Sequence, residues 1–370
     1  MSDPQIIPIT MPKWGLSMIE GKVIEWLVEE NTAIALGDEI MDIETEKIAN
    51  TFEALDVGIL RRRVAEADQT LGVGALLGVL ASAETADADI DSFIAEFQAN
   101  YVPPESAEEG ELGANYEWLN IGEQKIRYLR MGEGQQNIIL IHGFGGDLDL
   151  WLFTQEPLSS GATVYSLDLP GHGQSSKAVT DGSVAGLSEV IVSFMQALSI
   201  DNAHLIGHSL GGAVALQTAV SHPAKVSALS LIGSAGIGPE INGAYISGFV
   251  SSESRRDIKP LLQQLVGDPG LINRTMIDDI LKFKRLDGVS EALTKIAAGF
   301  LDGDKQTVDL RDSLASLSMP VQVIWGSEDR IIPAAHAEGL PSNVKVHILD
   351  GLGHLVQLEG ASDVNKLLQS

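Results

Sequence analysis

The stretch "AHLIGHSLGG", residues 203–212, decides the fold of most of this chain. An apolar run leads into Gly207, and Gly207–Gly211 has the pattern G-x-S-x-G. Glycines on both sides of Ser209 let the backbone of a buried strand turn sharply into a helix, and such a strained turn exposes the serine hydroxyl. The stretch therefore predicts a strand, a tight turn and a helix, with Ser209 as a candidate nucleophile.

Further stretches between about residue 115 and the end of the chain repeat this order of an apolar run followed by glycine and polar residues. They are "NIILIHGFGG", "ATVYSLDLPGHGQS", "VSALSLIGSAG", "VQVIWGSEDRIIP" and "VKVHILDGLGH". Short buried strands separated by helical segments are typical of a parallel sheet with helices on both faces. In such sheets the functional residues lie where the strands end.

A serine hydroxyl is a poor nucleophile until a base removes its proton, so a histidine held by a carboxylate is required. Asp329 follows the apolar run "VQVIWG", and His354 follows "VKVHILDGLG". We therefore expect Ser209, Asp329 and His354 to form a catalytic triad. The backbone N–H groups of Leu210, next to the nucleophile, and of Phe144, in the loop "HGFGG", are the candidate oxyanion-hole donors.

Other histidines and acids near these motifs have simpler interpretations. Asp302 is an alternative acid, but "FLDGDKQ" lacks a preceding buried strand, and Asp350 lies too near the predicted base in the sequence. We expect His142 and His208 to shape the site and His172 to be structural in its turn. No metal site is predicted.

The first part of the chain contains an internal repeat. Residues Gly21–Glu44 align without a gap on Gly58–Ala81, so that glycines, turn residues and apolar positions coincide. Short strand-like runs separated by Gly and Asn or Asp turns predict two similar β-sheet halves. Lys47, with Glu46 and Ile48 beside it, falls between the halves, either as an ordinary solvated turn or as a lysine presented for covalent modification.

A change in composition separates the two parts. Residues Glu84–Glu111 contain nine acidic residues and no lysine or arginine, and "VPPESAEEGELGA" reads as linker. Within this run Ile90, Phe93, Ile94 and Phe97 have the spacing of an amphipathic helix. The helix is expected to pack on a neighbouring domain, with docking of a partner protein as the alternative. The predicted domains are 1–82, a linker at 83–114, and 115–370.

Residues Ala235–Phe300 interrupt the strand pattern, and one third of all Lys and Arg residues lie there. The eight are Arg255, Arg256, Lys259, Arg274, Lys282, Lys284, Arg285 and Lys295. They can form an ordinary mixed helical surface, or a local site for an anionic substrate. Both interpretations stay open from the sequence alone.

Bulk properties exclude several functions. The chain has 370 residues, a hydrophobic content of 44% and a net charge of −27, which argues against nucleic acid and anionic membranes as partners. It has no cysteine, so disulfides, thiolate metal sites and a cysteine nucleophile are excluded. The N-terminus lacks a recognisable secretory signal, and no uncharged run is apolar enough for a membrane span. We expect a soluble cytoplasmic protein.

Two resemblances follow from these motifs. The repeat around Lys47, together with "MPKWGLSMIEGKVIEW", resembles a lipoyl domain over about residues 4–82. That family is a small flattened all-β barrel whose modified lysine lies at the tip of an exposed hairpin. Biotinyl domains share the fold but have methionines beside the lysine, so the resemblance implies lipoate on Lys47. Residues 115–367 resemble the α/β-hydrolase family, with residues of about 235–300 as a helical cap.

The combination resembles the dihydrolipoamide acetyltransferase component of acetoin dehydrogenase complexes. The resemblance implies an acyltransferase that passes an acetyl group from dihydrolipoyl-Lys47 to coenzyme A. It further implies two partners, an acetoin-cleaving component that uses thiamine diphosphate and a dihydrolipoamide dehydrogenase, and a homo-oligomeric core. If the basic cluster is a site for an anionic substrate, the phosphates of coenzyme A would bind at Arg255, Arg256 and Lys259.

The chain departs from acyltransferases of the pyruvate type. Their H-x-x-x-D-G motif is missing, since "HILDG" at His347 is one residue short, and no basic subunit-binding domain is visible in the acidic linker. Two other functions stay open. One is a lipoyl-tethered esterase or thioesterase that releases acid, and the other is a carrier whose hydrolase domain only scaffolds the complex.

Overall fold

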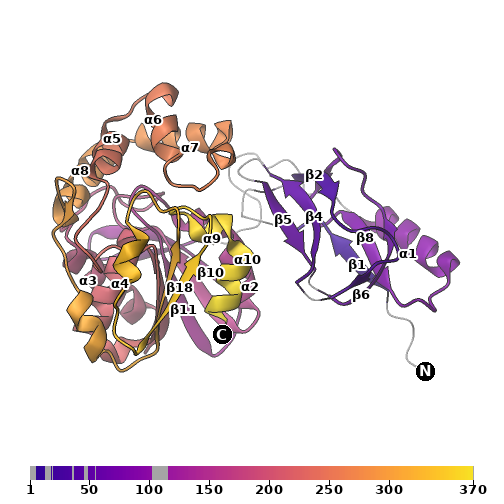
Figure 1. Ribbon diagram of the computed structural model, residues 1–370, viewed down its shortest axis with the longest axis horizontal. Helices are drawn as coiled ribbons and strands as arrows, with labels where there is room; N and C mark the ends of the chain where they lie inside the picture. The colour runs from indigo at the N-terminus through magenta and orange to yellow at the C-terminus, as the bar shows by residue number, and fades with distance from the viewer. Residues whose placement is uncertain are drawn as a thin grey trace. The chain divides into compact units, whose positions relative to one another are not determined.

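The computed structural model describes residues 6–12, 18, 20–35, 37–45, 49–54, 56–101 and 116–369. The chain divides into two compact units, Met1–Ala114 and Asn115–Ser370 (Figure 1). Each unit has its own hydrophobic core. No helix of the described residues is long and apolar enough to cross a membrane.

The first unit consists of two four-stranded antiparallel sheets that enclose one core. One sheet has the strand order β1-β8-β6-β3, and the other has the order β5-β4-β2-β7. The strands are β1 (Ile7–Thr10), β2 (Glu20–Trp26), β3 (Ala33–Ile34), β4 (Glu39–Glu44), β5 (Ala49–Glu53), β6 (Gly58–Arg63), β7 (Thr70–Gly72) and β8 (Leu76–Ala81).

Residues paired by the sequence repeat occupy equivalent places in these sheets. Val23 of β2 and its counterpart Leu60 of β6 are both fully buried in the core. Asn31 and its counterpart Asp68 both have a positive φ, 68° and 64°. Because few non-glycine residues adopt that conformation, the shared backbone geometry shows that the repeat is structural.

A helix that follows β8 packs on the first unit. In α1 (Asp87–Asn100), Ile90 is fully buried in a small cluster with Leu76 and Val79 of β8. Arg61 of β6 donates a hydrogen bond of 2.9 Å to Asp87, at the start of the helix. The expected amphipathic helix therefore forms, and it lies against the barrel that precedes it.

The second unit is built on an eight-stranded sheet with the order β18-β17-β14-β13-β11-β12-β10-β9. Neighbouring strands from β18 to β12 are parallel, whereas β10 pairs antiparallel with both β12 and β9. The strands are β9 (Tyr116–Ile121), β10 (Gln124–Met131), β11 (Gln136–Ile141), β12 (Ala162–Leu167), β13 (Ala203–His208), β14 (Val226–Ile232), β17 (Val321–Gly326) and β18 (Val344–Leu349).

Helices cover both faces of this sheet, as the alternation of strands and helices predicted. On one face α3 (Val184–Ala197) and α4 (Leu210–Ser221) pack together, and on the other α2 (Leu152–Ser159) packs with α10 (Ala361–Leu368) (Figure 1). The short helix α9 (Val356–Glu359) precedes α10. The expected architecture, a small all-β unit followed by a mostly parallel sheet with helices on both faces, is confirmed.

A group of helices interrupts the sheet after β14. These are α5 (Gly243–Ser251), α6 (Arg255–Leu262), α7 (Arg274–Lys284) and α8 (Val289–Phe300), and they lie together beyond one end of the sheet (Figure 1). A short antiparallel hairpin follows, with two residues in each strand, β15 (Leu301–Asp302) and β16 (Lys305–Gln306). It precedes β17 in the chain. This helical cap occupies the segment in which the sequence predicted one.

Candidate active site

Ser209 lies in the turn between β13 and α4, with φ 55° and ψ −120°. This conformation is rare for a residue with a side chain, and it persists only where the surroundings fix it. Here the surroundings are neighbouring backbone segments, which the glycines on both sides of Ser209 allow to come close. A methyl group at Gly207 would lie 2.2 Å from the carbonyl oxygen of Gly211, and one at Gly211 would lie 2.2 Å from that of Ile141. Only glycines allow β13, α4 and β11 to approach this closely.

The predicted acid and base are hydrogen-bonded to each other. Nδ1 of His354 lies 2.7 Å from Oδ2 of Asp329. The side chains are 3% and 0% exposed, so water screens this pair little. The carboxylate accepts a hydrogen bond from Nδ1–H of His354, so the lone pair of Nε2 can act as a base.

Two glycines show that the nucleophile, the base and the glycine-rich loop converge. A methyl group at Gly143 would lie 2.9 Å from Cβ of Ser209, so "HGFGG" passes directly beside the serine. A methyl group at Gly233, the residue after β14, would lie 3.2 Å from Nδ1 of His354. The neighbour of the serine, His208, donates from Nε2 to the backbone carbonyl of His354 over 2.9 Å.

The candidate oxyanion donors flank the serine. Leu210 is the first residue of α4, and backbone N–H groups in the first helical turn have no acceptor within the helix. Phe144 lies one residue after Gly143, and its ring packs against Phe249 and Phe300 of the cap, with ring centroids 6.1 Å and 5.8 Å apart. Phe144 thus belongs to a loop whose position is fixed by aromatic contacts with the cap.

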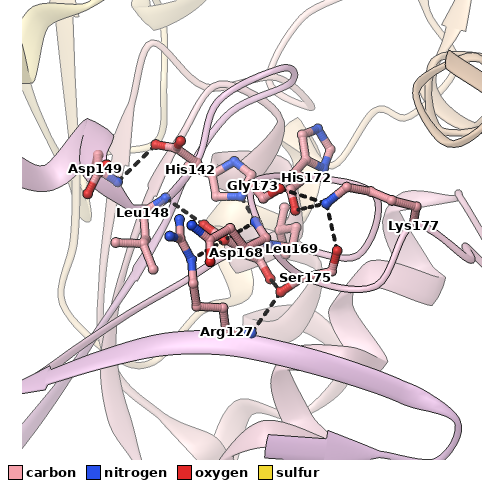
Figure 2. A network of polar contacts seen from close by, with 12 residues as sticks. Arg127, His142, Leu148, Asp149, Asp168, Leu169, His172, Gly173, Ser175 and Lys177 are labelled. Carbon is pink, nitrogen blue, oxygen red and sulfur yellow. Dashed lines mark hydrogen bonds and ion pairs between the residues drawn. The ribbon is translucent and has the colours of Figure 1, made fainter. Parts of the chain in front are cut away.

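Two further histidines, His142 and His172, are fully buried beside the site. Burial lowers the pKa of His142 to about 4 and that of His172 to about 3, so both rings are neutral near pH 7. His142 accepts the N–H of Leu169 at Nε2 over 2.9 Å and lies 2.7 Å from the carbonyl of Gly143 at Nδ1. It therefore ties the glycine-rich loop to the loop "DLPGHGQS", as Figure 2 shows.

A buried ion pair connects the loop "DLPGHGQS" to β10 and to the segment that follows the glycine-rich loop (Figure 2). Asp168, fully buried, accepts from Nε of Arg127 over 2.6 Å and from the backbone N–H groups of Leu148 and Gln174. Lys177 donates to three backbone carbonyls of the second loop, and burial lowers its pKa to about 8. Sequence reasoning missed this network, because nothing in the order of the residues pairs Arg127 with Asp168.

Several basic residues of the cap have structural contacts. Arg255 forms a bidentate pair with Asp278, and Lys295 donates to the carbonyls of Val179 and Thr180. Arg256 and Lys259 are exposed on α6. The basic cluster is therefore partly an ordinary helical surface, with Arg256 and Lys259 presented to solvent.

The alternative acids lie elsewhere in the fold. Asp302 is exposed in the small hairpin of β15 and β16. Asp350 lies just after β18 and accepts from Ser327 over 3.2 Å. The carboxylate beside His354 is that of Asp329.

Lys47 lies outside the described residues, as do Glu46 and Ile48. The strands before and after it, β4 and β5, are described and pair antiparallel, with Glu44 opposite Ala49. Lys47 is therefore located in the sequence between two paired strands, as the resemblance to lipoyl domains implied.

Comparison with known proteins agrees with both units. Residues 136–361 match the family model for the alpha/beta hydrolase fold, and residues 7–80 match the model described as biotin-requiring enzyme. Among solved structures, a 2-hydroxy-6-oxo-6-phenylhexa-2,4-dienoate hydrolase from a Rhodococcus strain aligns with a TM-score of 0.63 at 24% identity, over 69% of this chain and 97% of that one. That likeness concerns the fold alone.

Two curated relatives match over nearly their whole length. The chain is 47% identical to the dihydrolipoyllysine-residue acetyltransferase component of the acetoin cleaving system of Cupriavidus necator, covering 99% of this chain and 97% of that protein. It is 46% identical to the component of the same name from Pseudomonas putida, covering 98% and 97%.

The fold and these matches define the class first: the chain joins a biotinyl/lipoyl-type domain to an α/β-hydrolase domain. Within that class, it belongs to the family of dihydrolipoyllysine-residue acetyltransferase components of acetoin cleaving systems. The family identified from the sequence is confirmed. A covalent lipoyl cofactor and coenzyme A as substrate agree with this membership, and the proteins of the family are named as components of a larger system.

Proposed function

We propose that this chain transfers an acetyl group from dihydrolipoyl-Lys47 to coenzyme A, with Ser209 as nucleophile and His354 as base. The observation that carries the proposal is the buried hydrogen bond between His354 and Asp329, with the backbone of His354 bonded to His208, the residue before Ser209 in its strained turn. Family membership supplies the reaction class. The lipoyl group on Lys47 would supply the acetyl group as a thioester.

Acetyl transfer would take place in two half-reactions at Ser209. Oγ of Ser209 attacks the carbonyl carbon of the thioester, and Nε2 of His354 takes up the hydroxyl proton. The N–H groups of Phe144 and Leu210 stabilise the oxyanion. The carbon–sulfur bond then breaks, His354 returns the proton to the leaving sulfur, and the acetyl group stays on Ser209. The thiol of coenzyme A reverses these steps, and no oxidation or reduction takes place.

Asp329 would orient His354 and stabilise its charged form during both half-reactions. The carboxylate can serve this role because it is fully buried and oriented by backbone N–H groups of Ile331 and Ile332, at 2.8 Å and 2.9 Å. Exposed Arg256 and Lys259, with the paired Arg255 beside them, would attract the phosphates of coenzyme A.

The fold of the second unit also supports a second function, hydrolysis. The chain is 31% identical, over 66% of its length, to a protein from Paraburkholderia phymatum named as a 2-hydroxy-6-oxononadienedioate/2-hydroxy-6-oxononatrienedioate hydrolase. If water took the place of coenzyme A, the product would be free acetate, and the free energy of the thioester bond would be lost. Transfer to coenzyme A conserves that free energy in a new thioester. We therefore propose transfer over hydrolysis.

The larger system would include an acetoin-cleaving component that uses thiamine diphosphate and a dihydrolipoamide dehydrogenase, around a homo-oligomeric core of this chain. The family name, which makes the relatives components of a cleaving system, supports such partners. We place the protein in the cytoplasm with its substrates.

An assay with the purified, lipoylated protein, acetyl-dihydrolipoamide and coenzyme A tests the proposal. Acetyl-CoA should form in proportion to the donor consumed. Free acetate at the same rate with and without coenzyme A would instead identify a hydrolase. Turnover that is unaffected by Ser209→Ala would identify a carrier-scaffold.

A further inference from the structure

Trp325 is the last residue but one of strand β17, four residues before the predicted acid. Its indole ring is fully buried. Its Nε1–H group lies 3.0 Å from Oδ2 of Asp329 and 3.0 Å from the carbonyl oxygen of Ile332. The indole proton is therefore shared between a backbone carbonyl and the carboxylate oxygen that faces His354.

Burial alone does not require this bond. Trp151, immediately before α2, is also fully buried, and its Nε1–H group has no partner among the described residues. The fold thus tolerates an unpaired indole N–H group. A buried indole usually finds a partner, and at Trp325 the carbonyl of Ile332 would suffice. The contact with Asp329 is an additional one.

The carboxylate of Asp329 has different constraints on its two oxygens. Oδ1 accepts from the backbone N–H groups of Ile331 and Ile332. Among the described residues, Oδ2 accepts from two side chains, Trp325 and His354. Without the indole, His354 would be the one described donor on Oδ2, and only the backbone N–H groups on Oδ1 would hold the carboxylate while it orients His354.

The indole itself is held in place. The ring of His336 packs edge-on against it, with centroids 6.2 Å apart and an interplanar angle of 84°. His336 is in turn fixed by Glu240, 2.6 Å from its Nε2 atom, and by Arg311, which donates to its backbone carbonyl over 2.7 Å. Trp325 can therefore hold the carboxylate rather than move with it.

We infer that Trp325 is a positioning residue of the acyl-transfer site: its indole N–H fixes Asp329 so that Oδ2 faces Nδ1 of His354 throughout both half-reactions. The inference rests on the proposed function. The signal in the sequence is the tryptophan four residues before the acid in "VQVIWGSED". Because it continues the apolar run of the strand, the sequence pattern marks it only as a core residue.

The test compares Trp325→Phe with Trp151→Phe, which makes the same loss of ring volume in the core without removing a hydrogen bond. In Trp325→Phe, kcat for acetyl transfer should fall about tenfold, the scale of a lost hydrogen bond to a charged group. KM for donor and coenzyme A should stay within about twofold, because positioning acts on the transition state. Trp151→Phe should lose stability without this separation of kcat from KM.

A second measurement needs no activity. Proton NMR of the full-length protein should show the Nδ1–H resonance of His354, downfield of the amide protons and absent from His354→Gln. The resonance should broaden and exchange faster with water in Trp325→Phe, and it should persist in Trp151→Phe. If Trp325→Phe does not fold, incorporation of 3-benzothienylalanine at position 325 keeps the bicyclic ring and replaces the N–H group with sulfur.

An unchanged His354 resonance and an unchanged kcat in the variant at position 325 would overturn the inference, as would equal effects of the two phenylalanine variants. A wild-type protein that makes no acetyl-CoA would refute the proposed function instead. The NMR comparison would still decide whether Trp325 holds the carboxylate, so the two failures are distinguishable.

Discussion

Ser209 combines two properties that a nucleophile on a sheet requires. Its φ of 55° turns the side chain out of the strand, and its backbone N–H and carbonyl are both satisfied, by Ile232 at 2.9 Å and Ala235 at 3.0 Å. Because the backbone is fully bonded, the strained conformation is fixed by the structure around it. Replacing the side chain should leave this backbone intact.

Ser209→Ala should therefore abolish acetyl transfer in a correctly folded protein. Removing the nucleophile of a comparable triad costs on the order of 10⁶ in kcat. Asp329→Asn should also be severely impaired, because the carboxylate fixes the orientation and tautomer of His354. Steady-state kinetics with acetyl-dihydrolipoamide and coenzyme A measure both losses, and circular dichroism checks the fold.

A direct attack of the coenzyme A thiolate on the thioester gives the opposite pattern. Ser209→Ala would then lose little, whereas His354→Ala would lose ~10²–10⁴-fold, the scale of general-base catalysis. A serine-directed phosphonate adds an independent check, since it should label Ser209 and not the alanine variant. Near-normal transfer by Ser209→Ala would rule out the acyl-enzyme.

Lys47 should carry the lipoyl group. It lies in sequence between strands β4 and β5, which pair antiparallel, and between two halves whose buried residues coincide. Peptide mass spectrometry of protein from lipoate-replete cells should find the modification at Lys47, and Lys47→Arg should be unmodified and inactive in the full reaction. Lys22→Arg, on β2, is a matched control because Lys22 is engaged by Asp68 at 2.7 Å. Lipoate on another lysine would contradict the prediction.

At the scale of elements, the sequence predicted those strands that end in glycine and a functional residue. β11, β13, β17 and β18 all follow this pattern, because residues needed at the carboxyl edge interrupt the apolar run. The pattern did not predict that β10 pairs antiparallel with β9 and β12. Strand direction depends on the connections, and no residue at this edge carries chemistry that would mark it.

The sequence pattern also did not predict polar contacts between residues far apart in the chain. The sequence placed α1 inside the linker, but its Asp87 and Asp91 are met by Arg62 of β6 at 3.2 Å and 3.4 Å. Each such exposed pair contributes only about 0.2–1 kcal/mol, so most of the attachment comes from the apolar face of α1, with Ile90 fully buried and Phe93, Ile94 and Phe97 packed beside it. Apolar spacing revealed the helix, but only the fold shows which surface it covers.

Helix α6 is the element to which coenzyme A should bind. Arg256 and Lys259 are exposed on it, whereas Arg255 is paired with Asp278. The double variant Arg256→Glu, Lys259→Glu should raise KM for coenzyme A severalfold at low ionic strength, and salt should reduce the difference. Hydrolysis of a small neutral ester should change little, since such an ester carries no phosphate.

The matched control for α6 is Lys345→Glu with Lys366→Glu, on β18 and α10, which makes the same change in net charge at exposed positions outside the cap. If this control raises KM for coenzyme A as much as the α6 variant, the effect is one of overall charge. Equal loss of transfer and of ester hydrolysis in the α6 variant would show a structural role.

At the scale of the whole molecule, the two units have to exchange a substrate. A carrier tethered to its catalyst works at a high effective concentration, provided that the tether lets the carrier reach the site. The acidic composition of residues 102–115, which include two prolines, is typical of a linker. These residues lie outside the described part of the chain, so their role as a linker remains a prediction.

Limited proteolysis of the full-length protein should cut first between Pro103 and Gly113 and release two folded pieces. The first piece should retain α1, because Ile90 is buried against β8 and Tyr101 donates to the carbonyl of Val73 over 3.2 Å. Protease attack depends on local unfolding, which costs much in a helix that is docked on a folded unit. Mass spectrometry of the fragments locates the cut. Cleavage within α1 would contradict its attachment to the barrel, and resistance between Pro103 and Gly113 would mean that the units are docked, which would remove the basis for a tethered carrier.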